Sequence, residues 1–249
     1  MMMDIASLLT HSSDGADLIE AFCSHNSMLT KVARQAGLKC ERWTVDDFDL
    51  ATEEGYDQAE ARLRELQPRR IWLSPECGPF SQLQNANQRT EEQVENLKRK
   101  REEGLKQWHS CMRLAWVQLE LGGYFYIEQP QTCSTWQIND TLTNFIIWES
   151  SSYCIRDQCF DGLAHPKSGN PMKKSTRIQT NDESFSLNFG QRCVGHEIEH
   201  ARIEGGRLAR STSFYPKTVL SACGTALENL GQQANAEEFP QKVSGRKSS

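Results

Sequence analysis

Residues 70–81 read RIWLSPECGPFS, and this stretch decides how the chain is organised. Its first residues are mostly apolar and indicate a buried strand. The following residues include Pro75 and Pro79, which favour a rigid loop directly after that strand. In an open α/β sheet, ligands bind beyond the carboxyl ends of the strands. We therefore expect the loop around Cys77 to lie at the edge of the sheet where ligands bind.

Strand-like and helix-like segments alternate on both sides of this stretch. Helices are expected at 28–36, at a segment carrying Ala59, Leu63 and Leu66, at about 105–119 after a polar stretch, and at about 136–150. Further strands are expected at 17–22, 39–44, 124–127, 153–160 and about 177–180. Connections this short predict a mainly parallel sheet with right-handed crossovers. The expected fold class is thus α/β, Rossmann-like and doubly wound, with a small irregular lobe.

The expected domain organisation is one folded unit between two disordered ends. Residues 1–16 and 231–249 are polar and aperiodic and are expected to be disordered. The α/β core should cover 17–158, the irregular lobe 159–207, and a closing helix 208–230 should return to the core. Three loops, at 23–27, 75–85 and 128–134, each follow a strand. They should therefore meet on one edge of the sheet.

The composition limits the classes of protein that this chain can represent. The 249 residues contain neither an apolar run long enough for a membrane span nor a leading segment of signal-peptide type. We therefore expect a soluble, intracellular protein without membrane contact. The nine cysteines are odd in number and scattered, which favours reduced thiols. A net charge of −5 argues against tight nonspecific DNA binding, so any such contact needs a local basic patch.

Cys77 and Glu128 carry the strongest chemical signal. A cysteine held in a proline-bounded loop at a sheet edge suits a nucleophile, although most single cysteines are inert small hydrophobes. Glu128 follows the apolar residues 124–127, and a carboxylate there costs desolvation unless it has a task or a partner. Burial is expected to raise its pKa so that it can exchange a proton. The alternative for Glu128 is a cap on nearby backbone amides.

Two segments make the sequence resemble the DNA cytosine-5 methyltransferases, members of the S-adenosylmethionine-dependent methyltransferase superfamily. Residues 77–81, CGPFS, resemble the family's nucleophile loop, and residues 128–130, EQP, stand where the family has Glu-Asn-Val. The resemblance implies a methyltransferase fold in which Cys77 attacks C6 of a flipped cytosine and Glu128 contacts the N3 and amine of the base. It also implies that Arg177, in KKSTRIQTN, helps to anchor the base.

The resemblance further implies that S-adenosylmethionine is the cofactor. Residues 17–27, DLIEAFCSHNS, stand where the family has a strand and a glycine-rich turn, and Glu41 follows Glu20 at about the offset expected for a ribose-binding carboxylate. Phe214-Tyr215-Pro216 resembles the family's last motif. The residues expected to bind the cofactor are Glu20, Phe22, Cys23, Ser24, His25, Glu41, Asp49 and Pro75.

Three departures from the family pattern have physical consequences. The turn FCSHNS contains no glycine, although glycine permits close approach of the backbone to a ligand. Glu76 replaces a proline before Cys77 and is expected to raise the pKa of the thiol. At most about thirty residues remain for reading nucleic-acid sequence, so a targeting partner or a larger polyprotein context is expected.

Two lesser patterns have ordinary explanations that we favour. Residues 98–101, KRKR, could close over a phosphate backbone, but acidic neighbours favour a solvated helix face. Cys193, His196 and His200, with Cys159 or His165 as a fourth ligand, could bind zinc. Because tight ligand pairs are missing, we expect incidental histidines and no metal.

The leading interpretation is thus a methyltransferase that acts on a nucleic-acid base, with DNA favoured over RNA and cytosine C5 as the target atom. The second interpretation is a catalytically inactive relative of the fold that binds nucleic acid or protein, in a mobile-element or viral setting. The glycine-free turn and Glu76 favour that alternative. A third is a zinc-stabilised interaction domain centred on residues 159–200.

Overall fold

The computed structural model describes residues 15–82, 84, 90–203 and 208. The expected closing helix, the Phe214-Tyr215-Pro216 segment and most of the two expected disordered ends lie outside these residues. The elements, in chain order, are β1 (Leu18–Ala21), α1 (Met28–Gln35), β2 (Cys40–Trp43), α2 (Glu53–Leu66), β3 (Arg70–Leu73), η2 (Gly78–Phe80), α4 (Glu91–Glu120), β4 (Tyr124–Pro130), η3 (Ser134–Gln137), α5 (Leu142–Glu149), β5 (Ser152–Asp157), η4 (Gln158–Asp161), β6 (Ser175–Thr180) and α6 (Glu183–Phe189).

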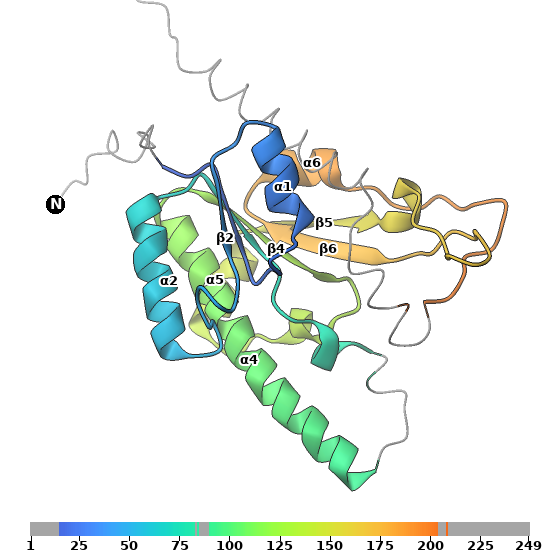
Figure 1. The fold of residues 1–249 in the computed structure, drawn as a ribbon, viewed down its shortest axis with the longest axis horizontal. Coiled ribbons are helices and arrows are strands. Elements are labelled where there is room, and N and C mark those ends of the chain that lie inside the picture. Colours follow the sequence, from blue (N-terminus) through green and yellow to red (C-terminus); the bar gives the residue numbers. More distant parts are fainter. Residues whose placement is uncertain (1–14, 83, 85–89, 204–207, 209–249) are drawn as a thin grey trace, which may run out of the picture.

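The described strands form a six-stranded sheet in the order β2-β1-β3-β4-β6-β5. The four strands β2, β1, β3 and β4 are parallel, and β6 runs antiparallel to both of its neighbours. This topology confirms the expected α/β class with a mainly parallel sheet (Figure 1). The chain moves outward in one direction through β1 and β2 and in the other through β3 and β4. The carboxyl ends of β1 and β3 therefore flank a topological switch point, where ligands bind in sheets of this kind.

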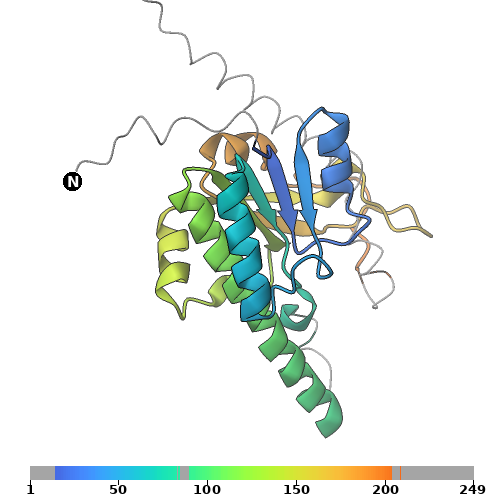
Figure 2. The ribbon, with the colours of Figure 1, turned by 60° about the vertical axis from the view of Figure 1, so that its left-hand side comes forward.

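Helices cover both faces of the sheet, as a doubly wound fold requires. Figures 1 and 2 show α1 and α6 on one face and α2, α4 and α5 on the other. Alternate strand residues supply the two cores because successive side chains point to opposite faces. Ile71 and Phe125 pack on the α4 side, whereas Trp72 and Tyr126 pack on the α6 side. The Tyr126 hydroxyl also donates a hydrogen bond of 2.7 Å to Asp182, which ties β4 to the start of α6.

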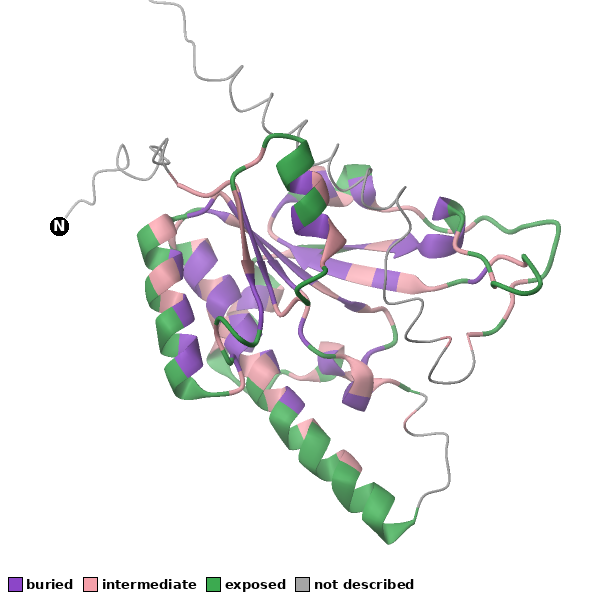
Figure 3. Cartoon of the chain, in the orientation of Figure 1, coloured by how far each residue is buried: buried purple, intermediate pink, exposed green. Residues whose placement is uncertain are grey.

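Helix α4 is longer than the apolar pattern predicts. It begins at Glu91, where the Thr90 and Gln93 side chains form a reciprocal capping box. Its first half is exposed and extends away from the body of the protein (Figure 3). Arg99 pairs with Glu103 at 2.9 Å, as on a solvated helix face. Neither α4 nor any other helix among the described residues is both long and apolar enough to cross a membrane.

The second half of the chain differs most from the expected element boundaries. Strand β4 continues through Pro130, so Glu128 lies in a strand and the expected loop at 128–134 was wrong for its first residues. The cause is β6, whose residues 176–178 pair with Glu128, Gln129 and Pro130. The expected helix at 136–150 divides into η3 and α5, and the pattern did not predict α6. Strand β6 comes from the segment expected to be an irregular lobe, yet it lies inside the main sheet.

Candidate functional site

A cavity of about 310 Å³ lies at the switch point of the sheet. It is lined by residues that follow three strands, together with one residue of α4: 22–23, 43–45, 48–50, 74, 76 and 107. Its volume is at the lower end of the usual range for small-molecule sites. Trp43 and Phe48 contribute an aromatic wall, with ring centroids 5.0 Å apart. Asp49, Glu76 and Gln107 add polar groups, so the lining suits a ligand that carries a flat ring, hydroxyl groups and positive charge.

The turn after β1 adopts an unusual backbone conformation. Phe22 has φ +58°, a left-handed conformation that is uncommon for a residue with a side chain. Glycine adopts this conformation readily, whereas Phe22 holds it at a conformational cost. The next residue, Cys23, donates hydrogen bonds from its thiol to the carbonyl oxygens of Glu20 and Trp43. Burial, followed by the charge of Glu20, raises the pKa of Cys23 to about 12, so this thiol stays protonated.

The structure brings only some of the expected cofactor residues together. Phe22, Cys23 and Asp49 line the cavity, and Pro75 lies between two lining residues. Glu20 instead turns to the start of α1, where it accepts hydrogen bonds from the Ser27 hydroxyl and from the amide and hydroxyl of Thr30.

Glu41, Ser24 and His25 also lie outside this cavity. Glu41 is the second residue of β2 rather than a residue at its end, and it forms an ion pair with Arg62 of α2. His25 pairs with Asp46 at 2.7 Å, with both side chains exposed. Asp49, in the loop just beyond β2, lines the cavity, whereas Glu41, selected by its offset from Glu20, does not.

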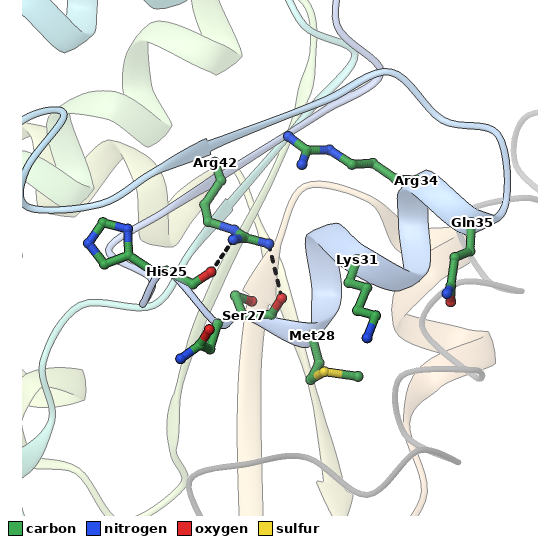
Figure 4. Close-up of a pocket in the computed structure, with 8 residues that line it drawn as sticks. His25, Ser27, Met28, Lys31, Arg34, Gln35 and Arg42 are labelled. Atoms are coloured by element: carbon green, nitrogen blue, oxygen red, sulfur yellow. Dashed lines mark hydrogen bonds between the residues drawn. The ribbon is translucent and has the colours of Figure 1, made fainter.

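A second, larger hollow of about 580 Å³ lies against α1. Three of the residues that line it are basic: Lys31, Arg34 and Arg42. Figure 4 shows Arg42 reaching the backbone oxygens of His25 and Ser27, the latter at 3.1 Å. Arg34 donates a hydrogen bond of 2.8 Å to the Cys40 carbonyl oxygen. These bonds hold two guanidinium groups in place, and the wall they form suits an anion such as a phosphate.

The Cys77 loop is held by hydrogen bonds from several elements. Cys77 is the residue before η2, and buried Phe80 ends that short helix. The Arg101 side chain donates to the Pro79 carbonyl oxygen at 3.1 Å, and the Ser134 hydroxyl donates to that of Phe80 at 3.2 Å. From β4, Gln129 donates to the Pro75 carbonyl oxygen. The backbone of the loop is thus fixed by α4, by β4 and by the segment that follows β4.

Cys77 lies within the electrostatic influence of Glu128. The pKa of the Cys77 thiol is raised to about 11, first by burial, then by the charge of Glu128 and by the neighbouring thiol Cys133. Lys174, just before β6, acts in the opposite sense. The pKa of Cys133 is also raised by burial and by Glu128. The expected increase for Cys77 is therefore present, but Glu128 and burial account for it instead of Glu76.

Arg177 is not brought to this group of residues. In the register of the sheet Glu128 pairs with Ile178 and Gln129 pairs with Arg177, so the side chains of Glu128 and Arg177 point to opposite faces. The Arg177 guanidinium lies over the rings of Tyr153 and Trp136, at 4.2 and 4.4 Å from their centroids. Burial lowers its pKa. Lys174 is a basic residue that lowers the pKa of the Cys77 thiol. From the sequence, the arginine of KKSTRIQTN was selected and this lysine was not considered.

A further group of side chains converges beyond β5. The ligand atoms of Cys159, Cys193, His196 and His200 all lie within 4.8 Å of one another. The structure thus brings together the three metal candidates of the sequence, and Cys159 rather than His165 is the fourth member.

Removing the charge of Glu128 is expected to make Cys77 more reactive towards alkylation. In Glu128→Gln the pKa of Cys77 should fall, so more thiolate is present at neutral pH and iodoacetamide should modify the residue about three- to tenfold faster. Peptide mass spectrometry over time measures the rate for each cysteine. Glu76→Gln is the matched control and should change the rate less, because Glu76 is not among the main groups acting on this thiol. An unchanged rate in Glu128→Gln would show that the two side chains are not coupled.

Comparison with known proteins gives only remote likenesses. No protein-family model matches the chain, and no curated protein is significantly similar to it. Among solved structures, it is similar to the S. pombe Dnmt2 methyltransferase, with 10% identity over 76% of this chain and a TM-score of 0.39. It is also similar to the Entamoeba histolytica methyltransferase EhMeth, with 12% identity over 75% of this chain and a TM-score of 0.37. The chain spans 58% of the length of each. Neither likeness identifies a family, so any function must be argued from the residues of the site.

Proposed function

We propose that this chain is an S-adenosylmethionine-dependent methyltransferase that acts on cytosine in a nucleic acid, with Cys77 as the nucleophile. The observation that carries the proposal is the coupling of the Cys77 thiol to the Glu128 carboxylate at the carboxyl edge of the sheet. A cavity lined by Ser74 and Glu76, which belong to the same loop as Cys77, lies at the switch point. A nucleophile, a proton-exchanging acid and a ligand cavity on one edge are what methyl transfer to a base carbon requires.

The cavity at the switch point would hold the cofactor. Asp49 would accept hydrogen bonds from the ribose hydroxyls, and Phe22 and Phe48 would contact the adenine ring. Glu76 supplies negative charge that would balance the positive sulfonium group. When bound, S-adenosylmethionine would supply an electrophilic methyl group. This assignment replaces Glu20 and Glu41, whose carboxylates already have partners within the fold.

Cys77 and Glu128 would have different roles in the reaction with the base. The target base must leave its stack to reach a thiol set in a fixed loop. Cys77 would lose its proton and form a bond to C6, while the electron pair moves to N3. Glu128 would accept the Cys77 proton and pass it to N3 as the bond to C6 forms. After C5 has gained the methyl group, N3 would return its proton to Glu128, the C5 proton would pass to a water molecule, and departure of the Cys77 thiolate would restore the aromatic ring.

Basic groups near the site would meet the phosphates of the nucleic acid. Lys174 lies close enough to act on the Cys77 thiol. The hollow lined by Lys31, Arg34 and Arg42 adds a second positive surface beside the turn after β1. Both compensate locally for a net charge of −5. We propose DNA as the favoured substrate, with a partner protein that directs the chain to its target sequence.

The test of this proposal is methyl transfer by the full chain. Labelled S-adenosylmethionine is incubated with the protein and, in separate reactions, with cytosine-containing DNA or RNA. Digestion and mass spectrometry should find 5-methylcytosine in one of the two, and a heat-denatured sample gives the blank. If the protein binds the cofactor but methylates neither polymer, the proposal is wrong.

A catalytically inactive binding module is the second candidate, and the state of Cys77 favours it. A pKa of about 11 leaves the thiol protonated in the free protein, and Phe22 stands where glycine would admit a ligand closely. Calorimetry with S-adenosylmethionine separates the two candidates. Binding in the micromolar range supports the enzyme, whereas absent or millimolar binding supports the module.

A further inference from the structure

We propose that Cys159, Cys193, His196 and His200 bind a structural zinc ion. Their ligand atoms all lie within 4.8 Å of one another, so a single ion can reach all four. The Cys193 sulfur lies 3.5 Å from Nε2 of His200. Tetrahedral zinc, with bonds of about 2.3 Å to sulfur and about 2.0 Å to nitrogen, places such a pair roughly 3.5 Å apart. The proposal does not depend on methyl transfer.

The type of ligand favours zinc over other common metals. Two thiolates and two imidazoles are soft or intermediate donors, whereas magnesium and calcium prefer oxygen ligands. The two histidine rings lie at 82° to each other, with centroids 4.9 Å apart, so they approach from different directions. Four protein ligands fill a tetrahedral site and leave no position for substrate, which is typical of a structural site.

The fold fixes the two halves of this site relative to each other. Cys159 lies in η4, immediately after β5, and the other three ligands lie in the segment after α6. Asp157 connects the two: its buried carboxylate accepts a hydrogen bond of 2.8 Å from the Cys193 amide, and its own amide donates to the Gln191 carbonyl oxygen at 2.8 Å. Figure 1 shows these two segments beyond the end of β5 and the start of β6, and Arg156 forms a bridge with Gln191 there.

The turn around Cys193 is shaped to hold a thiolate. The Gly195 amide points to the Cys193 sulfur at 3.4 Å, and donors of this kind stabilise a metal-bound thiolate. Gly195 has φ +112°, a conformation that side chains rarely allow. This glycine lets the chain turn back so that His196 reaches the same point as Cys193.

The segment that carries three of the ligands has little regular secondary structure and no apolar core. Between α6 and residue 203 the structure has no helix and no strand beyond a single bridge at Gln191. Val194 is 96% exposed and Ile198 is 59% exposed, so the segment forms no apolar core of its own. Small segments of this type usually need a metal or a disulfide to keep one conformation.

The first test is the metal content of the full chain purified without chelators. Elemental analysis should find about one zinc ion per chain. Cys193→Ser and His200→Ala should each lose most of it. Cys40→Ser and His165→Ala are matched controls, since they remove a half-buried thiol and a lobe histidine outside the cluster, and both should keep the zinc.

A second measurement on the unmodified chain keeps the proposal testable if the variants do not fold. Cobalt exchanged for zinc should give the strong visible bands of a tetrahedral site, and X-ray absorption should find two sulfur and two nitrogen neighbours at about 2.3 and 2.0 Å. Chelation should make the segment 190–203 sensitive to protease. A metal-free chain that gives no cobalt bands, or a Cys159–Cys193 disulfide found by mass spectrometry, would overturn the proposal.

Discussion

Cys77→Ser is expected to reduce methyl transfer by roughly a thousandfold or more, as loss of a covalent nucleophile does in other enzymes. Serine fits the same place because Cys77 precedes η2 and makes no disulfide. Its hydroxyl is a far weaker nucleophile than a thiolate and has no strong base beside it. Binding of S-adenosylmethionine should be unchanged, because Cys77 is not among the residues that line the switch-point cavity.

The control for this result is Cys40→Ser, which makes the same chemical change in a half-buried thiol on β2. It should leave the transfer rate within about twofold of the parent, because it touches none of the site. Thermal unfolding of both variants checks that the fold is intact. Equal incorporation of label by Cys77→Ser and the parent would remove Cys77 from the mechanism, and the proposed chemistry with it.

Glu20→Ala is expected to lower the free energy of unfolding by about 3–5 kcal/mol, because its carboxylate holds the start of α1. Glu20 is only 5% exposed and accepts three hydrogen bonds, including one of 2.9 Å from the Thr30 amide. Alanine would leave the buried Thr30 groups without this acceptor and would also remove a negative charge from the positive end of the helix. Urea unfolding followed by circular dichroism measures the loss.

Glu41→Ala provides the comparison for this effect. Glu41 lies on the neighbouring strand opposite Ile19. The side chains of its ion pair with Arg62 are each about one-third exposed, so its removal should cost less than about 1 kcal/mol. If Glu20→Ala kept the stability of the parent and instead lost S-adenosylmethionine binding, the carboxylate would serve the cofactor after all.

The sequence predicted the first half of the fold well because its signals are local. Helix α2 ends where expected, since Gln67 takes a left-handed conformation and Pro68 follows. The strands at 70–74 and 124–127 were found because they are buried on both faces and read as continuous apolar runs. The pairing of β6 between β4 and β5 carries no such signal, because it depends on residues about fifty positions apart.

The contrast between local signals and long-range strand pairing also explains which residues near the candidate site the sequence could predict. Cys77 and Glu128 were predicted to lie near each other because each follows an apolar run in the sequence, although the structure places Glu128 within β4. Lys174 was missed and Arg177 was selected because the choice between them is set by the register of β6, and a shift of one residue reverses the face of every side chain. Asp49 lies beyond β2 and lines the cavity, whereas Glu41, selected by its offset from Glu20, does not.

Strand β6 is synthesised after β4 and β5, although it pairs with both of them in the sheet. Until β6 has emerged from the ribosome, the backbone N–H and C=O groups on that edge of β4, a strand with apolar side chains, have no partner strand. An unpaired apolar edge is a template for pairing with other chains. A nascent or truncated polypeptide that stops near residue 150 should therefore self-associate, and chaperone capture should matter most in that interval of translation.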